Sequence, residues 1–253
     1  MSFLIINLSW RHAYIVIAGI GILWAFIWKY ISKGIYDTNE ITSKIKLNRK
    51  NVLSCIVNRK VLGMSIGFFC YNYIKNFYLT WFPSYLVSEK GFSILNVGIW
   101  GILPPIAAVF GGLIAGTITD KMISKGYSKT LSRKLPLCVG LICSGSIVFA
   151  ELVHSGYHAV VLLSFSFAMA IAASPSIWAI PGDIAPDPNL VGTIGGIQNT
   201  VSNIAGIVAP IITGYIIYRT GGFRTALLLS GVISCIGAFS YTFIVGKLEV
   251  IDI

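Results

Sequence analysis

Seven long apolar runs are the dominant feature of this 253-residue sequence. They cover residues 12–31, 61–87, 94–119, 135–153, 157–180, 190–218 and 223–246. A helix that crosses a bilayer needs about 20 mostly apolar residues, and each run is close to or above that length. The apolar residues are continuous and do not alternate with polar ones, which indicates helices and not barrel strands. The sequence therefore predicts an all-α fold, a polytopic membrane helical bundle of about seven transmembrane helices.

The composition excludes the main alternative classes. Hydrophobic residues make up 55% of the chain and charged residues 11%, whereas about a quarter of the residues of a soluble domain are charged. So few charged side chains cannot cover the surface of a soluble enzyme, and so many apolar ones argue against a disordered chain. The lipid bilayer is therefore the expected environment.

Alternate loops differ sharply in their basic residues. The loops on one side are rich in basic residues, and Lys29 at the end of the first run lies on the same side. These residues are Lys29, Lys33, Lys44, Lys46, Arg49, Lys50, Arg59, Lys60, Lys121, Lys125, Lys129, Arg133, Lys134 and Lys247. The opposite set holds Arg11, Lys90, Arg219 and Arg224. Lys and Arg collect in cytoplasmic loops, so we expect a multi-pass protein of the cell (inner) membrane with its N-terminus outside and its C-terminus in the cytoplasm. The same bias accounts for the formal net charge of +10, so no nucleic-acid partner is expected.

The sequence lacks the chemical motifs of enzymes. The five cysteines, Cys55, Cys70, Cys138, Cys143 and Cys235, show no metal-ligand spacing, and four of them fall inside apolar runs. We find no pairing of a nucleophile with a base and no glycine-rich phosphate loop. The sequence therefore predicts no enzyme, no catalytic residue, no metal and no cofactor.

Three stretches of the chain carry a family resemblance. The first is residues 77–98, FYLTWFPSYLVSEKGFSILNVG. The second is residues 111–120, GGLIAGTITD, followed by KG at 125–126 and RKLP at 133–136. The third is Trp178 with DIAP at 183–186 and GGIQN at 195–199, followed by Asn203 and Pro210. Together they resemble the anion:cation symporter family of the major facilitator superfamily, and most of all its bacterial sugar-acid branch, the glucarate, galactonate and hexuronate transporters.

This resemblance runs from residue 9 to about residue 246 and implies a major facilitator fold, which has about twelve spans in two six-helix halves. The chain resembles the sixth to twelfth of these spans. Residues 1–31 would then be the last helix of a missing N-terminal bundle, residues 32–60 a cytoplasmic central loop, and residues 61–253 the C-terminal six-helix transmembrane bundle. The implied function is the C-terminal half of a secondary active transporter for organic anions such as glucarate, galactonate or hexuronate.

The resemblance also implies the partners of the chain. The full-length protein would carry a small organic anion by alternating access, together with a proton, and this chain would need the N-terminal half. The family's carboxylates and arginine for proton coupling and anion binding lie on the five absent spans. In agreement, all nine acidic residues of this chain lie in loops, in the tail or at span ends. The alternative is a truncated, non-transporting membrane fragment, or a half-transporter that assembles with a separate N-terminal partner.

Polar residues in the second run form the first part of a predicted substrate site. Asn72, Lys75 and Asn76 are neighbours on one face of a helix. A lysine inside a membrane costs about 3 kcal/mol on insertion scales, and a water-filled cavity that holds an anion would satisfy it. The alternative is that Lys75 snorkels to an interface or pairs with a backbone carbonyl.

The sixth and fifth runs supply the rest of the predicted site. Asn199 and Asn203 lie four residues apart on one helix face, where they could hydrogen-bond a sugar acid or join helices. The resemblance favours Asn199 as a ligand because the family's Gly-Gly-x-x-Asn motif is intact, whereas Gln198 faces about a hundred degrees away. Trp178 either floors the cavity or belongs to an interfacial aromatic belt.

Asp120 and Arg133 are the predicted gating residues on the cytoplasmic side. Asp120 ends the third run, and the resemblance implies that it helps to hold the cytoplasmic gate closed. The sixth span begins on the same side with its positive dipole end, and Arg133 or Lys134 would be the nearby partners of Asp120. The alternative is an ordinary surface Asp at a helix end. Prolines in the third and fifth runs, at 104, 105 and 175, predict bends in those helices.

Overall fold

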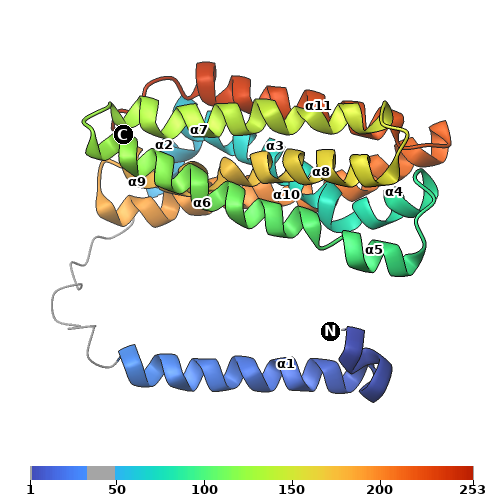
Figure 1. The fold of residues 1–253 in the computed structure, drawn as a ribbon. Coiled ribbons are helices and arrows are strands. Elements are labelled where there is room, and N and C mark those ends of the chain that lie inside the picture. The colour runs from blue at the N-terminus through green and yellow to red at the C-terminus, as the bar shows by residue number, and fades with distance from the viewer. Residues whose placement is uncertain (1, 33–48, 253) are drawn as a thin grey trace. The chain divides into compact units, whose positions relative to one another are not determined.

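A computed structural model describes the backbone of residues 2–32 and 49–252, and the side chains of residues 11, 12, 14–32 and 52–252. The chain divides into two compact units, Met1–Lys46 and Leu47–Ile253. The described residues contain helices and no strands (Figure 1), which confirms the predicted all-α fold.

The first unit contains the helix α1, Ser2–Ser32. Its segment Tyr14–Ser32 is long and apolar enough to cross a membrane, which confirms the first predicted span. Within this unit its large apolar side chains are exposed, among them Trp24 and Trp28, whose ring centroids lie 6.4 Å apart. A helix that is apolar on all sides is suited to lipid or to packing among other helices.

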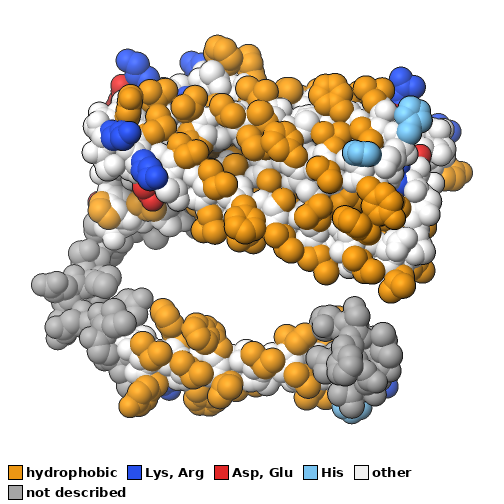
Figure 2. Space-filling model, in the orientation of Figure 1, with side chains coloured by type: hydrophobic (Ala, Val, Ile, Leu, Met, Phe, Trp, Pro, Cys, Tyr) orange, Lys and Arg blue, Asp and Glu red, His pale blue; other side chains and the backbone are white. Residues whose placement is uncertain are grey.

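The second unit is a bundle of long helices that lie side by side (Figure 1). Its elements are α2 Arg49–Val57, α3 Arg59–Thr80, α4 Phe82–Ser88, α5 Ile94–Trp100, α6 Leu103–Ser124, α7 Lys129–Ser144, the 3₁₀ helix η1 Gly145–Glu151, α8 Gly156–Ala172, α9 Ser174–Ile184, α10 Pro188–Thr220, α11 Arg224–Phe239 and the π-helix η2 Ser240–Ile244. Hydrophobic side chains cover most of the visible side of this bundle, and charged ones gather at its two ends (Figure 2).

Six of the seven predicted spans are confirmed as helical segments long and apolar enough to cross a membrane. One of the six is Tyr14–Ser32 of the first unit. The other five lie in the second unit and are Ile94–Ser124, Lys129–Glu151, Gly156–Ile184, Pro188–Thr220 and Arg224–Ile244. The predicted span at 61–87 is not among them. Its helix α3 is about 33 Å long at 1.5 Å per residue, which is enough to cross, but Asn72, Lys75 and Asn76 make it less apolar than the others. The number of clearly apolar spans in the described residues is therefore six and not seven.

Prolines end helices where bends were predicted. A short turn separates α5 from α6 just before Pro104 and Pro105, and α8 gives way to α9 at Ala173, two residues before Pro175. Proline lacks the backbone N–H and clashes with the preceding turn. The predicted spans at 94–119 and 157–180 are therefore each built from two helical pieces.

The predicted cytoplasmic loop at 32–60 is partly helical. Residues 33–48 lie outside the described residues, but Arg49–Val57 forms the helix α2. Cys55 of this helix is fully buried in the bundle core. Burial raises the pKa of its thiol, so the thiol stays protonated and acts as a packing group. A buried side chain in the segment explains why it is ordered helix and not open loop.

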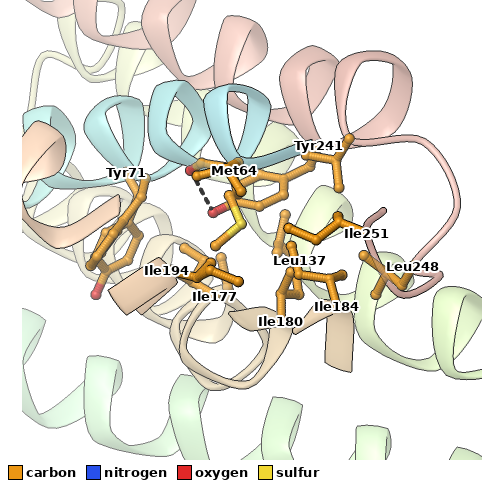
Figure 3. Close-up of a cluster of buried hydrophobic side chains, with 14 of the residues drawn as sticks. Met64, Tyr71, Leu137, Ile177, Ile180, Ile184, Ile194, Tyr241, Leu248 and Ile251 are labelled. Atoms are coloured by element: carbon orange, nitrogen blue, oxygen red, sulfur yellow. Dashed lines mark hydrogen bonds between the residues drawn. The ribbon is translucent and has the colours of Figure 1, made fainter. Parts of the chain in front are cut away.

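The core at one end of the bundle includes the C-terminal tail. Figure 3 shows Leu248 and Ile251 of the tail beside Ile184, within a cluster that also contains Met64 and Tyr241. The Tyr241 hydroxyl donates a hydrogen bond to the Met64 carbonyl oxygen at 3.2 Å. Backbone N–H groups of the tail bind other elements, with Leu248 donating to Thr130 Oγ1 and Ile251 to the Ile184 carbonyl, both at 3.0 Å.

Candidate functional site

The three polar residues of α3 share a helix face but differ in depth. The Asn76 side-chain amide donates to the Asn72 carbonyl oxygen at 2.8 Å, one turn earlier. Asn72 is only 4% exposed, and its Oδ1 has no hydrogen-bond partner. Lys75 and Asn76 are half-buried. The predicted neighbours are therefore together, with Asn72 on the buried side.

Lys75 stands at the end of a row of aromatic rings. Its Nζ lies 5.9 Å from the ring centroid of Tyr71. The Tyr71 and Phe68 centroids are 5.7 Å apart, and Phe68 meets Trp178 of α9 edge to face at 5.3 Å. Trp178 is itself 54% exposed. The row thus links Lys75 on α3 to Trp178 on another helix.

Lys75 has no carboxylate partner within the part of the chain that the structure describes. The salt bridge found there joins Arg133 to Asp183 instead. The described acids lie at helix ends, in turns or in the tail, and none lies in the middle of a membrane-crossing helix. A half-buried cation on this face is therefore uncompensated by the described bundle itself.

Small residues on α10 let this helix pack closely against the polar face of α3. A Cβ on Gly206 would lie 3.8 Å from the Asn76 side-chain nitrogen, and one on Gly214 would lie 3.0 Å from the Trp81 ring. Asn203 precedes Gly206 by three residues, so it lies within about one helical turn of the Asn76 contact. The structure therefore brings the polar residues of α3 and α10 to one region.

The two predicted asparagines of α10 are linked to each other. The Asn203 side-chain amide donates to the Asn199 carbonyl oxygen at 2.8 Å and to Asn199 Oδ1 at 3.1 Å. Asn203 is exposed and Asn199 is half-buried. Both keep polar atoms that a hydroxyl or carboxylate could use.

Gln198 has a different place from Asn199, as predicted. It is fully buried, and its Nε2 donates to the Ile177 carbonyl oxygen of α9 at 3.3 Å. Sequence reasoning missed this contact. The signal for it is Pro181, which lies four residues after Ile177 and has no N–H to give that carbonyl.

The predicted gating residues are not paired with each other. Arg133 Nε lies 3.1 Å from Asp183 Oδ2 of α9, and both side chains are mostly buried. Lys134 Nζ donates to the Thr242 carbonyl oxygen at 3.3 Å. Asp120 is exposed on α6. The expected partnership of Arg133 or Lys134 with Asp120 is therefore wrong for this conformation, because α9 places Asp183 against the start of α7.

The sequence did not predict Asp183, the first residue of the DIAP stretch at 183–186, as the partner of Arg133. Among the described residues, no cluster of three or more His, Cys, Asp or Glu side chains could hold a metal ion.

Comparison with known proteins identifies the family. The family model described as "Major Facilitator Superfamily" matches residues 1–210. The "Probable galactarate/D-glucarate transporter GudP" of Bacillus subtilis is 31% identical over 271 residues, which cover 98% of this chain and 59% of the relative.

Two further relatives have similar coverage. The "Hexuronate transporter" of Bacillus subtilis is 35% identical over 232 residues, covering 88% of this chain and 55% of the relative. The "D-galactonate transporter" of Escherichia coli O6:H1 is 32% identical over 267 residues, covering 96% of this chain and 61% of the relative. The chain thus spans about three fifths of the length of the curated relatives it matches.

A match to most of the chain, together with its apolar helices, shows a multi-pass membrane protein and confirms the resemblance described above. It also confirms the expectation that the chain is not an enzyme, because these relatives are named as transporters. The chain belongs to the Major Facilitator Superfamily and is similar to its sugar-acid transporters.

Proposed function

We propose that the helices of the second unit form one wall of the central site of a secondary transporter that carries a sugar-acid anion by alternating access. The observation that carries this proposal is Lys75, a half-buried cation with no carboxylate partner in the described bundle. A charge within a membrane is expensive and normally faces an aqueous cavity or a partner. A bound organic anion supplies that partner.

The other candidate ligands suit the remaining groups of a sugar acid. Asn199 and Asn203 carry both donors and acceptors, as hydroxyl groups require. Trp178 is about half exposed, and its ring packs edge to face against Phe68. The exposed part of the ring can pack against the carbon face of a sugar acid. The relatives named for galactarate and D-glucarate, hexuronate and D-galactonate support this substrate class.

Proton coupling, in this proposal, depends on residues beyond the described bundle. The described acids at helix ends are poorly placed for a relay across the membrane. We therefore assign the coupling carboxylates to a second bundle, contributed by the N-terminal part of a longer protein or by a separate chain. The transporter lies in the inner membrane, with the loop at 32–60 in the cytoplasm.

We also propose that the cytoplasmic gate includes Asp120 and Arg133. Arg133 acts through its ion pair with Asp183 in the present conformation. Asp120 is exposed near the end of α6, at the same end of the bundle as Arg133.

Uptake of radiolabelled galactonate, glucarate and hexuronates tests the proposed function. The chain is expressed alone and together with the N-terminal bundle of a relative, fused or as a separate polypeptide. We expect uptake when both bundles are present. Lys75→Ala should lower uptake at low substrate concentration about tenfold or more, because the anion loses its counter-charge.

The matched control is Lys129→Ala, which removes an exposed lysine at the start of α7 and should leave uptake unchanged. Uptake by the Lys75→Ala and Asn199→Ala variants at the level of their parent would show that the assigned site is wrong. Uptake by no combination of bundles would favour a membrane protein that does not transport these compounds.

A further inference from the structure

The backbone of α9 has a carbonyl group whose regular helical donor is missing. In an α-helix the Ile177 carbonyl oxygen would accept from the N–H of residue 181. Residue 181 is a proline and has no N–H. Ile177 is fully buried, so a donor from another element can take the place of the missing N–H.

Gln198 of α10 supplies that donor. Its Nε2 lies 3.3 Å from the Ile177 oxygen, and the Gln198 side chain is fully buried. A carbonyl oxygen only accepts, so the amide nitrogen and not Oε1 must face it. The Gln198 amide nitrogen is therefore the donor in this bond, while Gln198 Oε1 has no hydrogen-bond partner.

The bond joins the two chain segments that hold candidate ligands. Ile177 immediately precedes Trp178, and Gln198 immediately precedes Asn199. The bond is thus one residue away from each of them, although Trp178 and Asn199 lie on different helices.

The helix α9, which carries Trp178, is short, so contacts with other helices fix its position. α9 has 11 residues and follows the break at Ala173. Its far end is held by the ion pair of Asp183 with Arg133 and by the backbone bond from Ile251 to Ile184. Gln198 holds its middle, at the level of Trp178.

We infer that Gln198 is a positioning residue, whose bond to the Ile177 carbonyl keeps Trp178 of α9 in register with Asn199 of α10. The inference rests on the proposed function, because it concerns the geometry of that site. It assigns Gln198 no contact with the substrate.

The test distinguishes two roles of Gln198: positioning α9 against α10, and only giving the Ile177 carbonyl a hydrogen-bond donor. The Gln198→Met side chain has nearly the same length but no donor. Pro181→Ala restores an N–H that can satisfy the Ile177 oxygen within α9 itself. The double variant therefore satisfies the carbonyl without joining α9 to α10. Ser202→Ala is the control, since Ser202 is also buried on α10 but its hydroxyl bonds within that helix, to the Asn199 carbonyl.

Two readouts are used, both on the chain assembled with an N-terminal bundle. Sugar-acid uptake gives KM and the maximal rate. Amide hydrogen exchange of the peptide covering α9 reports its local opening without any need for transport. We expect Gln198→Met to raise KM and the α9 exchange rate about tenfold each, which corresponds to about 1.4 kcal/mol.

In the double variant the thermal stability should return toward that of the parent, while KM and α9 exchange remain raised. Full recovery of KM in the double variant would overturn the inference, because Gln198 would then only satisfy a carbonyl. So would an unchanged KM in Gln198→Met. If the parent transports no sugar acid but Gln198→Met still raises the amide exchange rate of α9, the proposed function is wrong. The role of Gln198 in positioning α9 is then still supported.

Discussion

Asn72 and Lys75 are three residues apart on α3, yet they meet different surroundings. Lys75 is half-buried beside the Tyr71 ring, whereas Asn72 is almost fully buried with Oδ1 unpartnered. Burying a polar group without a partner costs free energy. Asn72 is therefore a position where stability and the proposed substrate binding can be tested separately.

Replacing Asn72 should therefore separate stability from transport. Asn72→Leu removes the unpartnered acceptor at similar volume, so we expect the free energy of unfolding to stay equal or rise by about 1 kcal/mol. Under the proposed function uptake should also fall, because Asn72 is one of the predicted substrate ligands. Thermal melting in detergent and uptake measure the two effects. A variant that is both less stable and fully active would contradict this assignment.

The carboxylates at positions 120 and 183 should differ in their effect on stability. Asp183→Asn leaves the mostly buried Arg133 without its counter-charge, and we expect a loss of about 2–4 kcal/mol. Asp120 is exposed, so Asp120→Asn should change stability by less than about 0.5 kcal/mol. Melting temperatures of the two variants and of Arg133→Gln provide the comparison. Equal losses from both Asp variants would mean that Asp120 has a partner in solution.

At the scale of elements, glycines let the helices approach closely. A Cβ on Gly111 of α6 would overlap the Ala168 carbonyl oxygen of α8, and one on Gly140 of α7 would lie 2.6 Å from the Met169 carbonyl oxygen. Backbone atoms cannot move aside as a side chain can. These contacts hold α8 and, through it, the segment that leads into α9.

Gly111→Ala should accordingly push α6 away from α8, at a cost of about 1–3 kcal/mol. Gly98→Ala on α5 is the matched control, because a Cβ there meets nothing within 4 Å. Expression in the membrane and thermal melting are the measurements. A Gly111→Ala protein as stable as the control variant would show that α6 and α8 are less closely packed than described.

At the scale of the whole molecule, the charge bias predicts how the bundle is oriented. The loop at 32–60 carries a large share of the basic residues, and such loops stay in the cytoplasm. Protease added to right-side-out vesicles should leave this loop intact, whereas inside-out vesicles should allow cleavage. A cysteine substituted for Thr220, the last residue of α10, should react with a reagent added from outside. Cleavage in right-side-out vesicles would reverse the proposed topology.

The tail also belongs to this scale, since it joins elements that are distant in sequence. Leu248 and Ile251 pack in the same core as Ile184, and Lys60 Nζ donates to the Glu249 carbonyl oxygen at 2.9 Å. The tail thus joins the start of α3 to the start of α7 and the end of α9. Its sequence, with apolar residues alternating with charged ones, did not indicate that it lies in the core.

Properties that are local in the sequence could be predicted without the structure. Runs of about 20 apolar residues indicate membrane helices because the cost of burying backbone polar groups in lipid leaves little alternative. Pro105 and Pro175 mark helix breaks because a missing N–H acts within one turn. Asn199 and Asn203 are linked because residues four apart always meet on a helix.

Only the tertiary structure decided which residues from different helices meet. Arg133 pairs with Asp183, fifty residues away, and not with Asp120. Gln198 reaches Ile177, and Asn72 lies inside while Lys75 lies nearer the surface. These outcomes depend on the rotation and crossing of packed helices, which follow from the shapes of many side chains at once. Helical periodicity states which residues share a face, but the partner of that face is chosen by packing.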